Sequence, residues 1–341
     1  MKGKLRKLVG FLIAAAMLMA FMPNLAYALS GLEMETSHEW LTGDRSYSMA
    51  SAVGDVDGDG ATEIVTAGYF YNSTYDIFEG EVNIWHWNGT SLVEKHKKII
   101  DPTYTLSSDT RFYSVVLGNV DNEPDTEIVV AGYGNILGIM EQGLLIVLGW
   151  NGTSLENKTK IPGYWPLEIE KTEFFDVAIG DVDKDDTVEI IAVGYRNTTS
   201  FFGTGFHGVI TIWNITETGL TLETSAEWLI SGDTEWHSVA VDNIDGDGDV
   251  EIVVTGYFYD KTLEHECAMI RICTWDGSIL NWEASNQWYT YHDTYALDVA
   301  ISDIDVDGNK EIITIGRQFN GEAYYAQLRI WSWDGYTLTL R

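Results

Sequence analysis

The chain has 341 residues, of which 52 are acidic and 20 are basic, so its formal net charge at pH 7 is −32. This negative charge disfavours nucleic acids and anionic lipid surfaces as partners, because both would be repelled. With 45% hydrophobic residues and 5 prolines, the composition is that of a folded protein, and the length fits two or three ordinary domains or one large all-β domain.

Residues 1–28 are predicted to be a secretory signal peptide. Basic residues precede an apolar run from Val9 to Met22, and Ala26-Tyr27-Ala28 supplies a cleavage site with small residues. The alternative is an uncleaved membrane anchor, although the apolar run is short for a bilayer span. We therefore expect residues 29–341 to be secreted, extracellular or at the cell surface, with no membrane insertion once the signal is cleaved.

In an exported protein, cysteines can form disulfide bonds and Asn-x-Ser/Thr sequons can carry glycans. Cys267 and Cys273 are the only cysteines, and six residues apart on one extended strand they would be separated by ~20 Å, beyond disulfide reach. The fold is therefore not expected to depend on disulfides. Six Asn-x-Ser/Thr sequons predict a glycoprotein. They begin at Asn72, Asn88, Asn151, Asn157, Asn197 and Asn214.

One unit of sequence occurs five times. Each copy has an acidic segment and then an apolar run, as in Ala52–Asp59 followed by Glu63–Tyr69. The run ends in Gly-Tyr in four copies and in Gly-Arg in the fifth. The second acid of the segment falls at residues 57, 121, 183, 245 and 305, which gives steps of 64, 62, 62 and 60 residues. So regular a period indicates a repeat architecture.

Each copy carries four strand signals. A short β segment such as Ser238–Val241 precedes the acidic loop, and a nearly continuous apolar strand such as Ile252–Thr255 follows it. A third strand such as Glu81–Trp87 ends at an Asn-Gly or Asp-Gly hairpin turn, and a more polar fourth strand such as Leu220–Thr224 comes next. This gradation from buried to exposed, repeated radially, is typical of propeller blades.

The two ends of the chain predict how the repeats are arranged. Gly31–Trp40 closely matches Gly219–Trp228, the fourth strand of the third copy, whereas the last copy ends in the stub Tyr336–Arg341. An open stack would leave unpaired strand edges that invite aggregation. We therefore predict an all-β fold, a five-bladed β-propeller of four-stranded antiparallel blades, with the ring closed by the N-terminal strand.

The acidic loops predict metal sites. The first has acids at positions 1, 3, 5 and 9, with glycine at position 6. Carboxylates this close repel one another unless a cation lies between them, and hard oxygen ligands suit Ca²⁺, with a backbone carbonyl at position 7. An EF-hand needs glutamate at position 12, where this loop has Thr66, so the motif is a strand–loop–strand site. The alternative is five ordinary polar turns.

The loops differ in their predicted strength. The fourth has Asn243 at position 1, and the second has Asn119 there and Pro124 at position 6, where proline cannot adopt the expected positive φ. We expect the second site to be weak or altered, and about four to five structural Ca²⁺ sites in all. The predicted ligands are Asp55, Asp57, Asp59, Ala61, Glu63, Asn119, Asp121, Glu123, Asp125, Glu127, Asp181, Asp183, Asp185, Thr187, Glu189, Asn243, Asp245, Asp247, Asp249, Glu251, Asp303, Asp305, Asp307, Asn309 and Glu311.

The pattern Asp-x-Asp-x-Asp-Gly-x-x-acid between two strands resembles the FG-GAP repeat of integrin α-subunit propellers, and is similar to repeats of bacterial and archaeal secreted proteins and of some fungal lectins. The resemblance covers nearly all of residues 29–341. It implies calcium held by the matched loop residues and a role in adhesion or ligand binding. Two features depart from it: there are five units rather than seven, and Ala/Val/Thr-Gly-Tyr replaces the Phe-Gly and Gly-Ala-Pro signatures.

No catalytic motif is evident, so an enzyme is not expected. The sequence has no H-E-x-x-H or G-x-S-x-G pattern, and the G-x-G-x-x-G match at Gly203–Gly208 precedes a strand rather than a helix. One tryptophan before the hairpin turn recurs in four copies and is predicted to pack between blades. These residues are Trp87, Trp150, Trp275 and Trp333.

Function is expected on the face opposite the acidic loops, where the long connections between strands differ among copies. Aromatic residues there would suit stacking on sugar rings or anchoring a protein partner, and the alternative is that they cover the core. They are Trp165, Phe201, Phe202, Phe206, His207, Trp236, His237, Tyr291 and His292.

These observations predict an extracellular binding or adhesion module for a glycan or protein ligand. Two alternatives stay open. One is a secreted polysaccharide lyase or hydrolase, because some lyases are built on similar calcium propellers. The other is a structural component of a cell-envelope layer.

Overall fold

The computed structural model describes residues 36–101, 105, 107–121, 123–138, 140–159, 162–165, 170–200, 203–216, 219–290 and 292–341. The predicted signal peptide and the first half of the predicted N-terminal strand lie outside these residues. Among the residues that the model describes, no helix is both long and apolar enough to span a bilayer.

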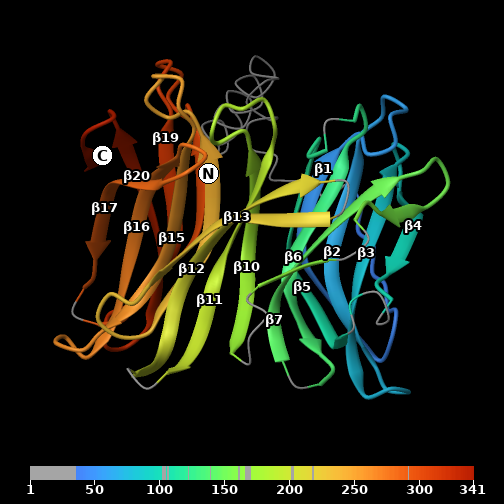
Figure 1. Cartoon of the computed structure of the whole chain (residues 1–341), viewed down its shortest axis with the longest axis horizontal. Helices are drawn as coiled ribbons and strands as arrows, with labels where there is room; N and C mark the ends of the chain where they lie inside the picture. The colour runs from blue at the N-terminus through green and yellow to red at the C-terminus, as the bar shows by residue number, and fades with distance from the viewer. Residues whose placement is uncertain are drawn as a thin grey trace, which may run out of the picture. The chain divides into compact units, whose positions relative to one another are not determined.

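The described strands form five antiparallel sheets, each with its strands side by side in chain order (Figure 1). This confirms the prediction of four-stranded antiparallel units, with one short extra strand, β9, beside β7 in the second sheet. The first sheet consists of β1 (Arg45–Gly54), β2 (Glu63–Asn72), β3 (Ile77–Trp87) and β4 (Leu92–Ile99). The second consists of β5 (Ser107–Gly118), β6 (Glu127–Ile136), β7 (Met140–Trp150), β8 (Leu155–Asn157) and β9 (Gly163–Trp165), and the third of β10 (Lys171–Gly180), β11 (Glu189–Ser200), β12 (Gly203–Thr216) and β13 (Gly219–Trp228). The fourth consists of β14 (Thr234–Asp242), β15 (Glu251–Asp260), β16 (His265–Trp275) and β17 (Leu280–Trp288), and the fifth of β18 (Thr294–Ser302), β19 (Glu311–Phe319), β20 (Tyr324–Trp333) and β21 (Leu338–Leu340).

The predicted gradation of burial across a sheet is present. Residues 251–256 of β15 are all buried, whereas β13 alternates between half-buried and exposed positions after its first residue. Isoleucine and valine fill the second strands because those strands are covered on both faces. The outer strand faces water on one side and therefore alternates.

A β-bulge in the first strand of every sheet explains the repeated glycine before the tyrosine. In β10 the register with β11 shifts between Phe174 and Asp176. This bulge brings the strands so close that a Cβ on Gly194 would lie 1.9 Å from the carbonyl oxygen of Glu173. The same 1.9 Å approach occurs in the other four sheets, so only glycine fits this position. These glycines are Gly68, Gly132, Gly256 and Gly316.

Apolar side chains fill the space between consecutive sheets in four clusters, one for each neighbouring pair. Trp275 belongs to the cluster between the third and fourth sheets, Trp333 to that between the fourth and fifth, and Trp150 packs against that between the first and second. These three tryptophans pack between sheets as predicted. Trp87 is half-buried and belongs to none of the four clusters.

The first and fifth sheets each keep one uncovered face in the described part of the chain. Leu328 of β20 is 64% exposed, although its register equivalents in the other sheets, such as Ile270, are fully buried against the following sheet. Val53 of β1 is 69% exposed, whereas its equivalent Leu117 packs against the preceding sheet. The fourth strand of the fifth sheet is also short, since β21 pairs only with residues 331–333 of β20. Closure of the ring stays a prediction.

Candidate metal centres and an aromatic belt

The acidic loops join the first and second strands of each sheet, and their backbones coil around the side chain at position 1. In the first loop the Asp55 carboxylate accepts the N–H of Gly58 at 2.8 Å and that of Gly60 at 2.9 Å, and both glycines have positive φ. The third loop adopts the same left-handed backbone with Lys184 and Asp186. The loop shape is therefore set by the chain itself.

A buried glutamate at position 9 anchors every loop. It begins the second strand, is at most 1% exposed, and accepts the backbone N–H of position 2 at 2.7–3.2 Å. Burial raises the pKa of Glu189 and of Glu251 to about 7. The five residues are Glu63, Glu127, Glu189, Glu251 and Glu311.

Each loop brings three carboxylates together, with one oxygen of each within 4.8 Å of the others, so each of the five clusters could hold a metal ion. The clusters combine positions 1, 3 and 9 in three loops, positions 3, 5 and 9 in the fourth, and positions 3, 7 and 9 in the second. The second and fourth clusters thus leave out position 1, and the weakness expected of the second site stays a prediction. The clusters are Asp55, Asp57 and Glu63; Asp121, Asp125 and Glu127; Asp181, Asp183 and Glu189; Asp245, Asp247 and Glu251; and Asp303, Asp305 and Glu311.

The remaining predicted ligands lie outside these clusters. Asp59, Asp185 and Asp307 at position 5 each accept the backbone N–H of position 7 at 2.8 Å. Those position 7 residues are Ala61, Thr187 and Asn309, and in the fourth loop Asp249 donates likewise to Asp247 at 2.7 Å. Asn243 accepts the N–H of Gly246 at 2.7 Å, while Asn119 and Glu123 bond to each other. Their part in metal binding stays a prediction.

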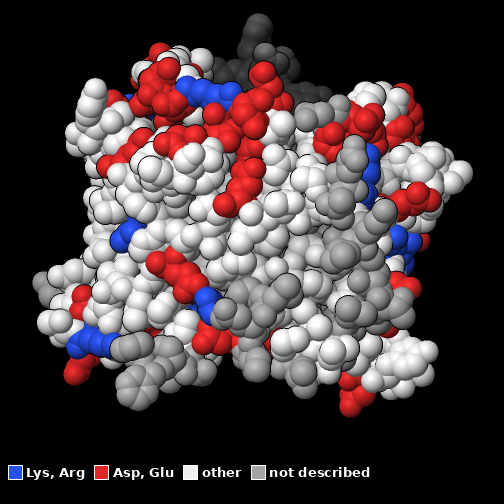
Figure 2. Space-filling model, in the orientation of Figure 1, with Lys and Arg blue, Asp and Glu red and all other residues white. Residues whose placement is uncertain are grey.

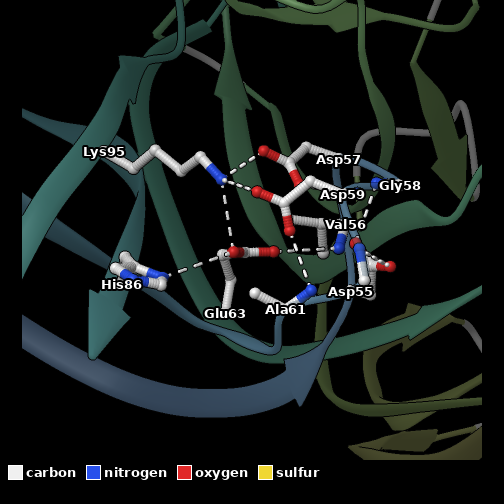
Figure 3. A network of polar contacts seen from close by, with 10 residues as sticks. Asp55, Val56, Asp57, Gly58, Asp59, Ala61, Glu63, His86 and Lys95 are labelled. Carbon is white, nitrogen blue, oxygen red and sulfur yellow. Dashed lines mark hydrogen bonds and ion pairs between the residues drawn. The ribbon is translucent and has the colours of Figure 1, made fainter. Parts of the chain in front are cut away.

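Three cationic side chains enter the clusters, and none of them is among the residues predicted from the sequence. Lys95 of β4 contacts Asp57, and its Nζ lies 3.2 Å from Glu63 and 3.5 Å from Asp59 (Figure 3). Burial alone would lower the pKa of this ammonium, but hydrogen bonds to Asp57 and Glu63 raise it well above its usual value. The signal that could have found it is a spacing of seven residues from Asn88 of the hairpin turn to Lys95, which recurs from Asn151 to Lys158.

Lys158 and Arg341 make the equivalent contacts in the second and fifth loops. Lys158 Nζ lies 2.9 Å from Asp121, 3.0 Å from Asp125 and 3.0 Å from Glu127. The Arg341 guanidinium lies 3.1 Å from Asp305 and 2.9 Å from Glu311. Acidic side chains gather at the top of the face seen in Figure 2, where the C-terminus also lies in Figure 1.

At the other end of the same strands, ten rings form a connected network that we call the aromatic belt. Eight of them make a continuous row to which every sheet contributes, while Tyr133 and Tyr195 pack beside the row on Tyr113 and Phe175. Neighbouring ring centroids lie 4.7–6.4 Å apart. In the second, third and fourth sheets one ring comes from the bulge and one from the tyrosine after the close-packed glycine. The belt is Tyr47, Tyr69, Tyr113, Tyr133, Phe175, Tyr195, His237, Tyr257, Tyr295 and Tyr324.

Charged groups accompany the belt. The Tyr195 hydroxyl donates to Glu173 at 3.1 Å, and the Tyr257 hydroxyl donates to Glu235 at 3.0 Å. The Arg111 guanidinium lies 5.5 Å from the ring centroid of Tyr133, within cation–π range. Tyr133 and Tyr195 are 4% and 7% exposed and so belong to the core beside the belt, whereas the other eight rings are half-buried or exposed. The accessible belt thus combines apolar ring faces with carboxylates and a guanidinium.

The predicted ligand-face residues are only partly found at this belt. His237 belongs to it, and Phe206 touches it through Tyr195 at 4.8 Å between ring centroids. Trp165 and Trp236 are buried at 6% and 0% exposure, so they cover the core instead. His207 lies 3.5 Å from Glu227 and His292 packs on Phe319. Phe201, Phe202 and Tyr291 lie outside the described residues.

No protein-family model matches this chain, and no curated protein matches it. Among solved structures, the chain is similar to a rhamnogalacturonan lyase of Bacillus licheniformis, with 11% sequence identity and a TM-score of 0.44. The match covers 85% of this chain, and it spans 57% of the lyase chain.

Proposed function

We propose that this protein is an extracellular calcium-binding β-propeller that binds a carbohydrate chain along the aromatic belt. The observation that carries this proposal is the continuous row of rings across all five sheets, with carboxylates and a guanidinium beside it. Sugar rings stack their apolar C–H faces on aromatic side chains, while their hydroxyls donate to carboxylates. A row of rings suits a chain of sugars better than a single one.

Calcium is the metal that we propose for the acidic loops. Every donor in the clusters is a carboxylate oxygen, and Ca²⁺ takes six to eight hard oxygen ligands in flexible loops. The resemblance to FG-GAP repeats and the predicted signal peptide support the same assignment, because extracellular modules of this kind bind calcium. The metal would tie each hairpin to the start of its second strand, which is a structural role.

We further propose that the five sheets close into a ring. The contacts of Trp40 with the first sheet support closure. Its ring centroid lies 4.8 Å from that of Trp85, and its Nε1 donates to Glu81 at 3.2 Å. At the end of the fourth sheet, Trp288 lies 5.1 Å from Trp331 and donates to Gln327 of the next sheet at 2.6 Å. Trp40 therefore docks on the first sheet as the last residue of a preceding fourth strand would.

The fifth sheet has room for that strand. A groove of about 360 Å³ is lined by residues 327–330 of β20 and by Leu340 and Arg341. Residues 36–40 are long enough to continue the strand where β21 stops, and the covered face would include Leu328. Trp40→Ala should lower the melting temperature, as should deletion of residues 29–39. The same melting temperature for both variants and the parent would contradict closure by this segment.

The test of the binding function is a screen of glycans followed by titration of belt variants. Phe175→Ala and His237→Ala should each weaken binding of the best glycan about two- to twelvefold, because one aromatic stacking contact is worth roughly 0.5–1.5 kcal/mol. Tyr336→Ala is the matched control, since Tyr336 is 91% exposed and outside the belt. Unchanged binding by both belt variants, or capture of proteins but no glycan, would contradict the proposal.

One observation favours a second function, cleavage of the bound polysaccharide. The Glu235 carboxylate lies 3.3 Å from His237 Nε2 and accepts from the Tyr257 hydroxyl, so three titratable groups meet within the belt. Such a group could remove a proton from a sugar ring. Release of unsaturated or reducing ends by the parent, abolished in Glu235→Gln, would establish this function, and no release from any bound polysaccharide would exclude it.

A further inference from the structure

The five acidic loops differ in the residue that the fourth strand places beside them. We call this the counter-position. In the second to fifth sheets it is the fourth-strand residue that directly follows the pairing partner of Leu148, Trp213, Cys273 or Trp331. In the first sheet it is assigned by the seven-residue spacing from the hairpin turn. The counter-position holds Lys95, Lys158, Glu223, Glu283 and Arg341 in the first to fifth sheets.

A cation at the counter-position occupies the cluster itself. Lys158 Nζ lies within 3.0 Å of all three carboxylates that form the second cluster. Lys95 contacts two of the three in the first cluster, and Arg341 two of the three in the fifth. A metal ion could enter these clusters only by displacing a cation that already lies 2.9–3.2 Å from the buried glutamate. These three loops therefore do not fit a metal well.

The third and fourth loops have the opposite arrangement. Their counter-positions hold Glu223 and Glu283, which bring a further negative charge. The charges of Asp183 and Asp185 act on Glu223, and those of Asp245 and Asp247 act on Glu283, which places each glutamate beside its loop. Lys184 of the third loop contacts Asp249, which lies outside the fourth cluster.

The third and fourth clusters contain no cation among the described residues. Glu251 is 1% exposed and its carboxylate accepts the N–H of Ile244 at 2.7 Å, but no described lysine, arginine or histidine contacts it. In the third cluster the Thr187 hydroxyl lies 3.0 Å from Glu189 and 2.5 Å from Asp185, and no described cation contacts Glu189. Three carboxylates this close repel one another, so a metal ion would relieve a repulsion that no side chain relieves in these two clusters.

We propose that the third and fourth loops alone bind metal, and that Lys95, Lys158 and Arg341 are built-in counter-ions that replace the metal in the other three. This proposal rests on calcium binding as proposed above, and it narrows the expected four to five sites to two. The counter-position is then the residue that decides whether a loop binds an ion. It also makes the third and fourth sheets the part of the molecule that responds to calcium.

The experiment measures the number of calcium ions bound by the full chain. After dialysis against a chelator, titration with CaCl₂ by calorimetry, with metal analysis of the loaded protein, should give two ions per chain. Glu283→Lys copies the residue of the first two sheets and should leave one ion, while Lys95→Met should give three. Glu94→Lys is the matched control, because Glu94 is an exposed neighbour of Lys95 on the same strand and should leave two ions.

Each outcome decides between the claims. Four or five ions in the parent, or two ions in parent and all variants alike, would overturn the assignment to the counter-position while leaving calcium binding intact. No calcium bound would overturn both. The circular dichroism spectrum of Glu283→Lys must match that of the parent. If Lys95→Met does not fold, the loss of one calcium ion in Glu283→Lys decides the test.

Discussion

The two ends of the same strands behave differently across the five sheets. At the loop end every sheet repeats the same buried glutamate with the same backbone partner. At the belt end, the repeated Gly-Tyr or Gly-Arg motif of the second strand pairs through its last residue with a first-strand residue that varies. From the first sheet to the fifth, that first-strand residue is tyrosine, arginine, glutamate, glutamate and tyrosine. The repeated residues at the loop end are those that each sheet needs in order to fold. The residues that vary at the belt end are those that we expect to serve ligand binding, which the molecule needs only once. Substitutions at the two ends should therefore affect different properties.

The largest expected effect on stability is at the close-packed glycines between the two ends. Gly256→Ala would place a Cβ 1.9 Å from the backbone oxygen of Glu235, which cannot move without separating β14 from β15. We expect a loss of about 3 kcal/mol or more in the free energy of unfolding, at the upper end of overpacking effects. Denaturant unfolding measures it. Gly54→Ala is the control, since its Cβ would meet only the Leu117 side chain at 3.1 Å, and equal losses would refute the explanation.

Metal removal should come next and should act only on the loop end. An ion held at about ten times its dissociation constant stabilises by about 1.4 kcal/mol, so chelation of two sites should lower the melting temperature by roughly 5 °C. Scanning calorimetry with and without chelator measures the shift. The shift should be the same in Phe175→Ala as in the parent, and a smaller shift in that belt variant would show that the two ends are coupled.

The smallest expected effect is a pH dependence at the belt end. Burial, together with the charges of Asp293 and Glu235, raises the pKa of Glu266 to about 7. The unfolded chain releases this proton near pH 4.3, so the stability gained from protonated Glu266 is complete below that pH and is lost as the pH rises through about 7. Glu266→Gln should therefore raise the melting temperature more at pH 8 than at pH 5. An equal change at both pH values, as expected for the exposed control Glu94→Gln, would contradict this.

The strands, hairpins and acidic loops could be predicted from the sequence because their signals are local. Alternation, Asn-Gly turns and acid spacing all lie within a few residues of the structure they specify. The counter-ion Lys95 needs a further step, since the seven-residue spacing from the hairpin turn predicts its contact with the loop only once the register of β4 on β3 is known. The belt was missed for a similar reason: bulges in separate sheets align Tyr113, Phe175 and His237, and no local pattern encodes that alignment.

The four apolar clusters, each shared by two consecutive sheets, have a consequence for how the chain is made. A chain built from neighbour-to-neighbour contacts gains stability one unit at a time, in the order of synthesis. In the closed ring proposed above, the first sheet to emerge would keep Val53 uncovered until the last sheet has been made, so the nascent chain would carry an apolar edge until then. Chaperone dependence should consequently be greatest for chains truncated before the fifth repeat.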